Sequence, residues 1–297
     1  MIVHRCNAPS NWRAEQSLAQ ALISSGVPGL AGIDTRALTI RLRNTGTLKG
    51  FLCSTGAVPL EEGVARACEW AGLDNQDYAQ KVSTLDAYIF DPDDTLTATW
   101  GIAEGPLPEA DIPVVAIDYG LKRNILRSLR QEGMRVTVVP ARTTAAEVLA
   151  LNPAGVFLSN GPADPAALTY AIETIRSLIG KVPMMGICLG HQLLGRAYGG
   201  RTCRLKFGHH GCNHPVKELA SGKVEITSQN HNFIVDMDSL DSALIEVTHV
   251  NLNDNTVEGM RHRREPVFSV QYHPEAAPGP HDSRYVFNQF KKLILSA

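Results

Sequence analysis

A cysteine between two glycines is the feature of this sequence that most directly suggests catalysis. The segment GICLG puts Cys188 at the end of an expected strand, residues 182–188, with an apolar-faced helix behind it. This is the layout of a nucleophile elbow, in which flanking glycines allow the chain to turn sharply. The N-terminus of the helix also favours the thiolate. A free cysteine more often packs as a small buried hydrophobe, but this position favours a nucleophile.

A histidine and a glutamate two residues apart supply the partners that a thiol nucleophile needs. In VFSVQYHPE, an apolar run predicts a strand that delivers His273 at its end. Residues i and i+2 of an extended chain share one side, so Glu275 can reach the His273 ring. A surface His-x-Glu in a loop is the alternative. Beside a cysteine elbow, the pattern instead favours a Cys-His-Glu triad.

A turn at the end of a third expected strand supplies backbone donors. The segment SNGPADP, residues 159–165, places Gly161 where its N–H can join that of Leu189, the residue after the nucleophile. Two such donors form an oxyanion hole, which stabilises the charge that develops on the carbonyl oxygen. A plain turn leading into a helix is the other interpretation, and the segment alone does not decide between them.

A histidine-rich segment, FGHHGCNHPV, raises the question of a metal site. Its candidate ligands are His209, His210, Cys212 and His214. Their spacing fits no zinc pattern well, and no second cluster of ligands balances them. We expect structural hydrogen bonding here and no metal.

The elements around these motifs alternate between strands and helices. Strands are expected at residues 113–120, 134–140, 155–160 and 182–188, with helices at 121–133, 143–151 and 165–180 between them. This order predicts an α/β fold with a doubly wound, mostly parallel sheet. Ligands bind such sheets at the carboxyl ends of the strands, where all three motifs lie.

The N-terminal part is less regular and carries no catalytic pattern. We expect a helix over residues 14–26 with Leu18, Leu22 and Ile23 facing inward, a second over 35–46, and a short strand over 48–54. A stretch rich in Pro, Gly and Asp follows, and we place the domain boundary near 100–111. The two domains are then 1–110, a smaller α+β domain, and 111–297, the α/β domain.

Length and composition exclude several other classes of protein. The 297 residues have a net charge of −2, so no basic excess points to nucleic acid or to an anionic membrane. The apolar runs are too short to span a bilayer. The first residues lack the apolar region of a secretory signal, and the six cysteines form no CxxC pair. We expect a cytoplasmic protein.

Taken together, the motifs resemble a known family, the small chains of carbamoyl-phosphate synthase. GICLGHQ and HPE resemble the wider class I glutamine amidotransferases, whose glutaminase domain uses a Cys-His-Glu triad. FGHHG, DYGLKRNILR and PGPHDS are more specific to the carbamoyl-phosphate member. The N-terminal PSNWR and GLAGIDTRALTIRLRNTGTLKG are similar to the second half of that family's N-terminal domain, so the resemblance covers nearly the whole chain.

The resemblance implies roles for individual residues. The nucleophile falls on Cys188, the base on His273 and the orienting acid on Glu275. The implied glutamine-binding residues are Gly161, Ala163, Leu189, Gln192, Asn230, Asn232 and Phe233. The family usually has glycine at 163 and at 232. A methyl group at 163 crowds the loop, whereas asparagine tolerates a left-handed backbone.

The resemblance also implies a function and a partner. The chain would hydrolyse L-glutamine through a thioester and deliver ammonia to a large synthetase chain, in a heterodimer or a higher oligomer of heterodimers. The large chain would combine the ammonia with bicarbonate and ATP, for arginine and pyrimidine biosynthesis. No GxxxxGK[ST] loop is present, so no cofactor is expected on this chain, and ATP and Mg are expected on the partner.

The start of the chain differs from the family pattern, and other functions compete with the leading one. Relative to the family, a segment before Met1 is absent, including a serine of the glutamine pocket, so we expect a truncated N-terminal domain. A misassigned start codon, a fragment of a longer chain and a shortened variant are equally compatible with this. The alternatives are another class I amidotransferase or γ-glutamyl hydrolase, or a truncated, non-catalytic partner of the large chain. The segment 1–110 and FGHHG weigh against the first alternative, and the intact triad weighs against the second.

Overall fold

The computed structural model describes residues 1–12, 14–100, 106–277 and 279–297. The chain divides into two compact units, residues 1–72 and residues 73–297. The sequence placed the division near 100–111, of which residues 101–105 lie outside the described part. The contacts place it earlier, between residues 72 and 73.

Hydrogen bonds to residues of the α/β region explain why the chain after residue 72 belongs to the second unit. The Thr84 N–H donates to Asp118 at 2.8 Å, and the Asn75 N–H donates to Asp164 at 2.8 Å. A short strand, β1 (Tyr88–Ile89), also pairs with the sheet. The Pro- and Asp-rich composition there therefore accompanies an irregular stretch within the unit.

The first unit contains helices α1 (Leu18–Ser24), α2 (Thr35–Thr45) and α3 (Leu60–Glu69). Ser17 and Asp34 cap the first two, as expected for short polar side chains at N-caps. None of the side chains of these three helices is fully buried. Leu18 and Leu22 are half-buried, but Ile23 is 80% exposed, so its expected inward position is wrong.

The position of Ile23 follows from helix geometry. Leu18 and Leu22 are one turn apart on one face, whereas Ile23 is rotated by about 100° from Leu22. The strand expected over 48–54 is also wrong, because these residues form irregular chain.

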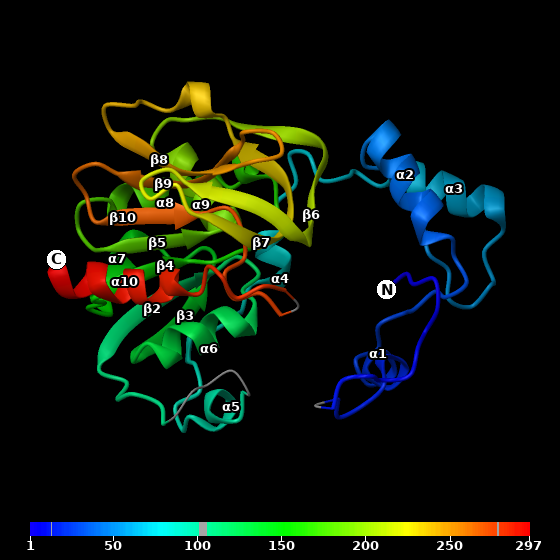
Figure 1. The fold of residues 1–297 in the computed structure, drawn as a ribbon, viewed down its shortest axis with the longest axis horizontal. Coiled ribbons are helices and arrows are strands. Elements are labelled where there is room, and N and C mark those ends of the chain that lie inside the picture. Colours follow the sequence, from blue (N-terminus) through cyan, green and yellow to red (C-terminus); the bar gives the residue numbers. More distant parts are fainter. Residues whose placement is uncertain (13, 101–105, 278) are drawn as a thin grey trace. The chain divides into compact units, whose positions relative to one another are not determined.

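The second unit is built on one ten-stranded sheet (Figure 1). Besides β1, its strands are β2 (Ile112–Asp118), β3 (Met134–Pro140), β4 (Gly155–Leu158), β5 (Met184–Ile187), β6 (Thr202–Glu218), β7 (Val224–Val235), β8 (Ile245–Asn251), β9 (Val257–His262) and β10 (Val267–Val270). Its helices are α4 (Ala79–Val82), α5 (Thr95–Ala98), α6 (Arg123–Gln131), α7 (Ala145–Ala150), α8 (Thr169–Leu178), α9 (Leu189–Ala197) and α10 (Tyr285–Ser296), with 3-10 turns at Pro165–Ala167 and Met237–Ser239.

The strand order is β1-β3-β2-β4-β5-β10-β9-β8-β6-β7. The five neighbouring strands β3, β2, β4, β5 and β10 run parallel to one another. All other neighbouring strands pair antiparallel. The predicted α/β fold with a largely parallel central sheet is confirmed. The extended antiparallel part, β6 to β9, was not predicted.

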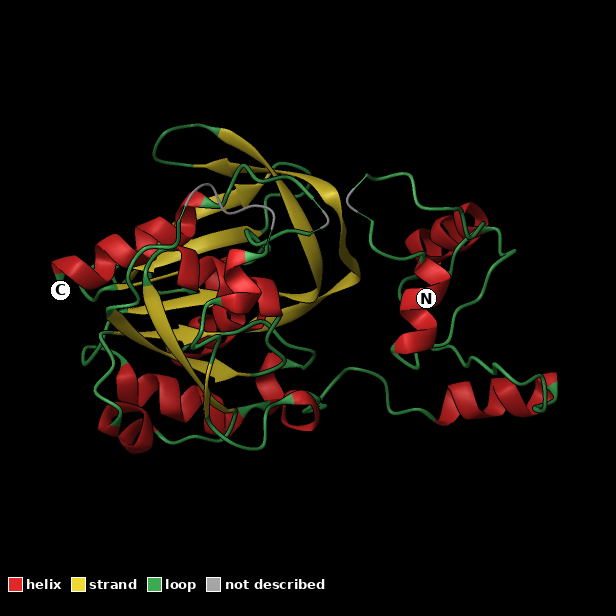
Figure 2. Ribbon diagram, turned by 90° about the horizontal axis from the view of Figure 1, so that it is seen from below, coloured by secondary structure: helices red, strands yellow, loops and turns green. Residues whose placement is uncertain are grey.

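Helices cover both faces of the parallel strands, as a doubly wound sheet requires (Figure 2). Apolar side chains of α6 and α10 form one core with the sheet, and those of α8 and α9 form the other. Each predicted helix of this region is present with shorter bounds, and Thr144 caps α7 through a reciprocal bond with Glu147. Among the described residues, none of the helices has the length and apolar character needed to cross a bilayer.

The register brings the ends of the central strands to one edge. Ile117 is opposite Leu158, Leu158 is opposite Gly186, and Ile187 is opposite Val270. The residues that follow β2, β4, β5 and β10 therefore leave the sheet side by side. This edge is where the sequence predicted the chemistry.

Candidate active site

Cys188 lies in the sharp turn between β5 and α9. Its backbone has φ +53° and ψ −102°, a left-handed conformation that is strained for a residue other than glycine. The side chain is 5% exposed, at the N-cap position of α9. The predicted strand–cysteine–helix elbow is therefore present, with the sulfur at the positive end of the helix dipole.

The glycines around the cysteine are required by close backbone packing. A Cβ at Gly190 would lie 2.2 Å from the Leu158 carbonyl oxygen, and one at Gly186 would lie 2.7 Å from the carbonyl carbon of Gly190. Real Cβ atoms do not approach so closely, so a side chain at either position would push the elbow away from the sheet.

We expect Gly190→Ala to destabilise the second unit and misplace the nucleophile. Overpacking of this kind costs about 3 kcal/mol, because backbone atoms of β4 cannot move aside as a flexible side chain does. At this size, that corresponds to a fall in melting temperature of roughly 6–12 °C. Calorimetry checks it. Gly50→Ala is the control, because nothing lies within 4 Å of its added Cβ; equal shifts for the two variants would contradict this account.

His273 and Glu275 form a buried pair directly after β10. His273 Nδ1 lies 2.8 Å from Glu275 Oε1, and the two residues are 8% and 1% exposed. Burial opposes a charge on His273, but Glu275, followed by Cys188, raises its pKa from 6.5 to about 10. Burial also opposes a charge on Glu275, yet attraction to His273 keeps the pKa of Glu275 below its usual value. The pair therefore carries an imidazolium and a carboxylate at neutral pH.

Lys122 completes this charged group, and sequence reasoning missed it. Its Nζ lies 3.4 Å from Glu275 Oε1 and donates to the Ala276 carbonyl. The ammonium contributes to the lowered pKa of Glu275. The available signal was weak: Lys122 follows the end of β2, at the same edge of the sheet as the triad.

A cavity of about 280 Å³ opens between these elements. Its lining residues are Leu73, Asn160, Gly161, Pro162, Ala163, Cys188, Gln192, Asn230, His231, Asn232, Phe233 and His273. It is large enough for an amino-acid side chain and presents both a thiol and an imidazole. Most residues selected from the sequence therefore meet at one cavity.

Two of the selected residues lie outside the lining. Glu275 stands behind His273, and Leu189 is buried beneath the cavity wall at 1% exposure. Ala163 and Asn232 both line the cavity, and neither has a positive φ. The side chains at these two positions therefore cause no left-handed backbone strain.

The two backbone segments expected to form the oxyanion hole pack against each other. A Cβ at Gly161 would lie 3.0 Å from the Leu189 side chain and 2.0 Å from the Tyr119 carbonyl oxygen. The Gly190 N–H also donates to the Ser159 carbonyl at 3.0 Å. Gly161 and Leu189 are thus held together beside Cys188, and their role as oxyanion donors stays a prediction.

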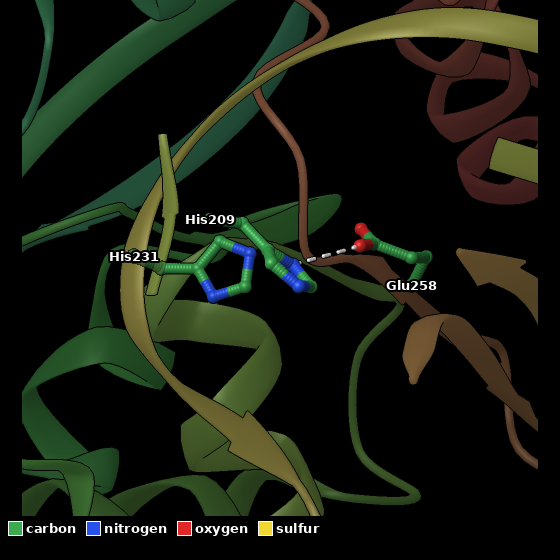
Figure 3. A group of neighbouring side chains, drawn as sticks. All are labelled: His209, His231 and Glu258. Atoms are coloured by element: carbon green, nitrogen blue, oxygen red, sulfur yellow. Dashed lines mark ion pairs between the residues drawn. The ribbon is translucent and has the colours of Figure 1, made fainter. Parts of the chain in front are cut away.

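The histidine-rich segment lies in β6 and contacts a residue of the cavity wall. His210 Nδ1 lies 3.0 Å from Oδ1 of Asn230, a cavity residue. His209 belongs to a buried group with His231 and Glu258, whose possible metal-ligating atoms all lie within 4.8 Å of one another (Figure 3). No metal was expected from the sequence, and that stays a prediction. His231 lines the cavity but was not selected; its position between Asn230 and Asn232 was the available signal.

Comparison with protein families assigns both parts of the chain. The family described as "Glutamine amidotransferase class-I" matches residues 115–293. The family described as "Carbamoyl-phosphate synthase small chain, CPSase domain" matches residues 1–52. The first match includes the Cys188 elbow and the His273–Glu275 pair.

Individual relatives match almost the full chain. The carbamoyl phosphate synthase small chain of Akkermansia muciniphila is 51% identical over 288 residues, which cover 97% of this chain and 75% of the relative. The protein of the same name from Chlorobaculum tepidum is 52% identical over 294 residues, with the same coverage. The one from Bacillus caldolyticus is 48% identical over 295 residues and covers 99% and 75%.

A solved structure agrees on the fold alone. It is described as a candidate GMP synthase component from Thermoplasma acidophilum and matches with a TM-score of 0.55 at 21% identity. The match covers 62% of this chain and 94% of the other. The sequence matches are far closer, and they show that this chain belongs to the carbamoyl phosphate synthase small chain family.

Proposed function

We propose that this chain is the glutaminase subunit of a carbamoyl phosphate synthase. It hydrolyses the side-chain amide of L-glutamine and passes the ammonia to a large synthetase chain. The observation that carries the proposal is the meeting of Cys188 and His273, backed by Glu275, at one cavity. Membership of the small chain family supports the same role.

In the first half of the reaction, the Cys188 thiolate attacks the amide carbon of glutamine. The N–H groups of Gly161 and Leu189 receive the oxyanion of the tetrahedral intermediate. His273 Nδ1 is held by Glu275, so Nε2 is the nitrogen that faces the nucleophile and gives its proton to the leaving nitrogen. The C–N bond breaks, ammonia leaves, and a thioester on Cys188 remains.

In the second half, water opens the thioester. His273, now neutral, takes a proton from the water as its oxygen attacks the same carbon. The C–S bond breaks, the thiolate is restored and glutamate leaves. The raised pKa of His273 suits this cycle, because the imidazolium that gives its proton to the leaving nitrogen is already present when glutamine arrives.

The synthetase chemistry belongs to the partner in this proposal. The large chain binds ATP and Mg and combines ammonia with bicarbonate, because this chain lacks a phosphate-binding loop. We propose one small chain per large chain in the functional unit.

Co-purification with a large synthetase chain, followed by glutaminase assays with and without it, tests the proposal. We expect a stable complex that releases glutamate and makes carbamoyl phosphate from glutamine. A complex that works with ammonia but never with glutamine would identify a non-catalytic partner. Glutamine hydrolysis with no binding to a large chain would identify a free hydrolase instead.

A further inference from the structure

Glu258 is a buried carboxylate that does not line the cavity and has no direct part in the proposed reaction. Glu258, in β9, is 0% exposed, and the two histidines beside it, His209 and His231, are each 5% exposed. Figure 3 shows the three side chains grouped together, with a dashed line that joins His209 to Glu258. A buried carboxylate is costly unless hydrogen bonds and a cation compensate it.

Both oxygens of Glu258 accept hydrogen bonds from neutral amides. Asn251 Nδ2 donates to Oε1 at 2.8 Å, and Gln229 Nε2 donates to Oε2 at 2.8 Å. These bonds give each carboxylate oxygen a hydrogen-bond partner. We therefore interpret the group as a hydrogen-bonded network.

His209 faces Glu258 as its ion-pair partner. Its Nδ1 lies 3.5 Å from Glu258 Oε1, and its Nε2 lies 2.8 Å from Oδ2 of Asp254, which is partly exposed. Burial lowers the pKa of His209, but its bonds to Glu258 and Asp254 outweigh burial and raise it overall. The neighbouring ring of His214 belongs to the same strand and is not hydrogen-bonded to Glu258.

Polar contacts lead from Glu258 to the cavity wall. Gln229 Oε1 lies 2.9 Å from His231 Nε2, and His231 Nδ1 lies 2.8 Å from the Phe233 carbonyl oxygen. Burial holds the pKa of His231 well below its usual value, so the neutral ring donates to one of these two oxygens. The same carbonyl accepts a bond from Gln192 Nε2 at 2.6 Å. We call this series, from Glu258 through Gln229, His231 and the Phe233 carbonyl to Gln192, the relay.

The relay fixes the orientation of a cavity side chain. Gln192 Nε2 has two acceptors, the Phe233 carbonyl and Gln271 Oε1 at 3.1 Å, so its nitrogen is directed away from the substrate space. Its Oε1 is then the end left for a donor on the substrate. The position of the Phe233 carbonyl therefore decides how Gln192 meets glutamine.

We propose that His209, which does not line the cavity, is a positioning residue for glutamine binding. Its imidazolium balances the buried charge of Glu258, and that balance holds the relay in the arrangement that orients Gln192. This inference rests on the proposed glutaminase function.

The decisive experiment compares two variants in the complex with the large chain. His209→Gln keeps a hydrogen-bond donor for Asp254 but leaves the buried charge of Glu258 without a counter-charge. We expect its KM for glutamine to rise on the order of tenfold, because an uncompensated buried charge distorts its surroundings, while kcat changes less than about threefold. Ammonia-dependent synthesis stays unchanged.

Adding Glu258→Gln to His209→Gln should restore KM to within about threefold of the wild type. With both charges gone, amide groups can satisfy the whole relay: the amide introduced by Glu258→Gln donates to Gln229, Gln229 to His231, and His231 to Phe233. Simple loss of packing at two sites would instead give losses that add. Should His209→Gln not fold, the double variant still has to fold and bind glutamine.

His214→Gln is the matched control, because it makes the same chemical change on the same strand without touching Glu258 by a hydrogen bond. An unchanged KM in His209→Gln, or additive losses in the double variant, would overturn this inference and leave the glutaminase function standing. An inactive wild-type complex would overturn both. Glutamine titration calorimetry in a Cys188→Ser background measures the same effect without turnover.

Discussion

Cys188→Ser abolishes glutamine hydrolysis, with an expected fall in kcat of at least about 10³-fold. Serine is nearly the same size, so the elbow and the cavity stay intact. Its hydroxyl, however, is a much weaker nucleophile at neutral pH than a thiol. Glutamate release by the complex measures the loss, and trapping with labelled glutamine should detect no thioester.

The same complex provides its own control for folding. Carbamoyl phosphate synthesis from ammonia should continue in Cys188→Ser, because added ammonia bypasses the amide step. Retained glutaminase activity in this variant would show that the nucleophile lies elsewhere. Loss of both activities would point to a broken complex and would require Cys188→Ala.

The second large effect is expected for His273→Asn, with a fall in kcat of about 10²–10⁴-fold. Without the imidazole, neither the leaving nitrogen nor the attacking water exchanges a proton with the enzyme. The buried Glu275 carboxylate keeps a cation after the substitution, because Lys122 Nζ lies 3.4 Å from its Oε1. Single-turnover measurements should show that both formation and opening of the thioester slow down.

Glu275→Gln separates proton transfer from orientation. It should cost less than His273→Asn, because Glu275 orients the ring and transfers no proton to the substrate. Among the causes that raise the pKa of His273, the charge of Glu275 is the largest. The wild-type imidazolium is still present at neutral pH and is lost as the pH rises through about 10, so removing Glu275 moves this alkaline loss of activity to lower pH. If Glu275→Gln and His273→Asn had equal, small effects and left the pH profile unchanged, HPE would be only a structural turn.

Much of the parallel half of the sheet and the triad can be predicted from the sequence, for a physical reason. Each strand there is a short apolar run, each helix has a cap or a glycine stop, and each motif sits at a strand end. Gly133, with φ +88°, ends the helix before β3 as its position suggests. Local signals decide these elements, and sheet topology then brings their ends together.

The rest depends on contacts between distant residues. Lys122 and Ala276 are 154 positions apart, and no local sequence pattern near Lys122 predicts that contact. The long pair β6 and β7 contains bulges and polar residues, so its alternation is interrupted. Asn230 and Phe233 were selected by family resemblance, whereas His231, between them, was missed. The division between the two units at residue 72 was missed. Composition indicates that a stretch is irregular, but it does not tell which of the two units that stretch packs against.

The sheet curls so that its last strand in order, β7, returns to its centre. The His273 N–H donates to the Ser228 carbonyl at 2.9 Å, and Gln192, in the helix after β5, donates to Phe233 in β7. Residues of β7 and residues that follow the central strands therefore line one cavity. A molecule bound there contacts both parts of the sheet, so any change in how β7 packs on the centre changes its affinity. By thermodynamic reciprocity, a partner whose binding shifts β7 and a molecule in the cavity alter each other's affinity by the same factor.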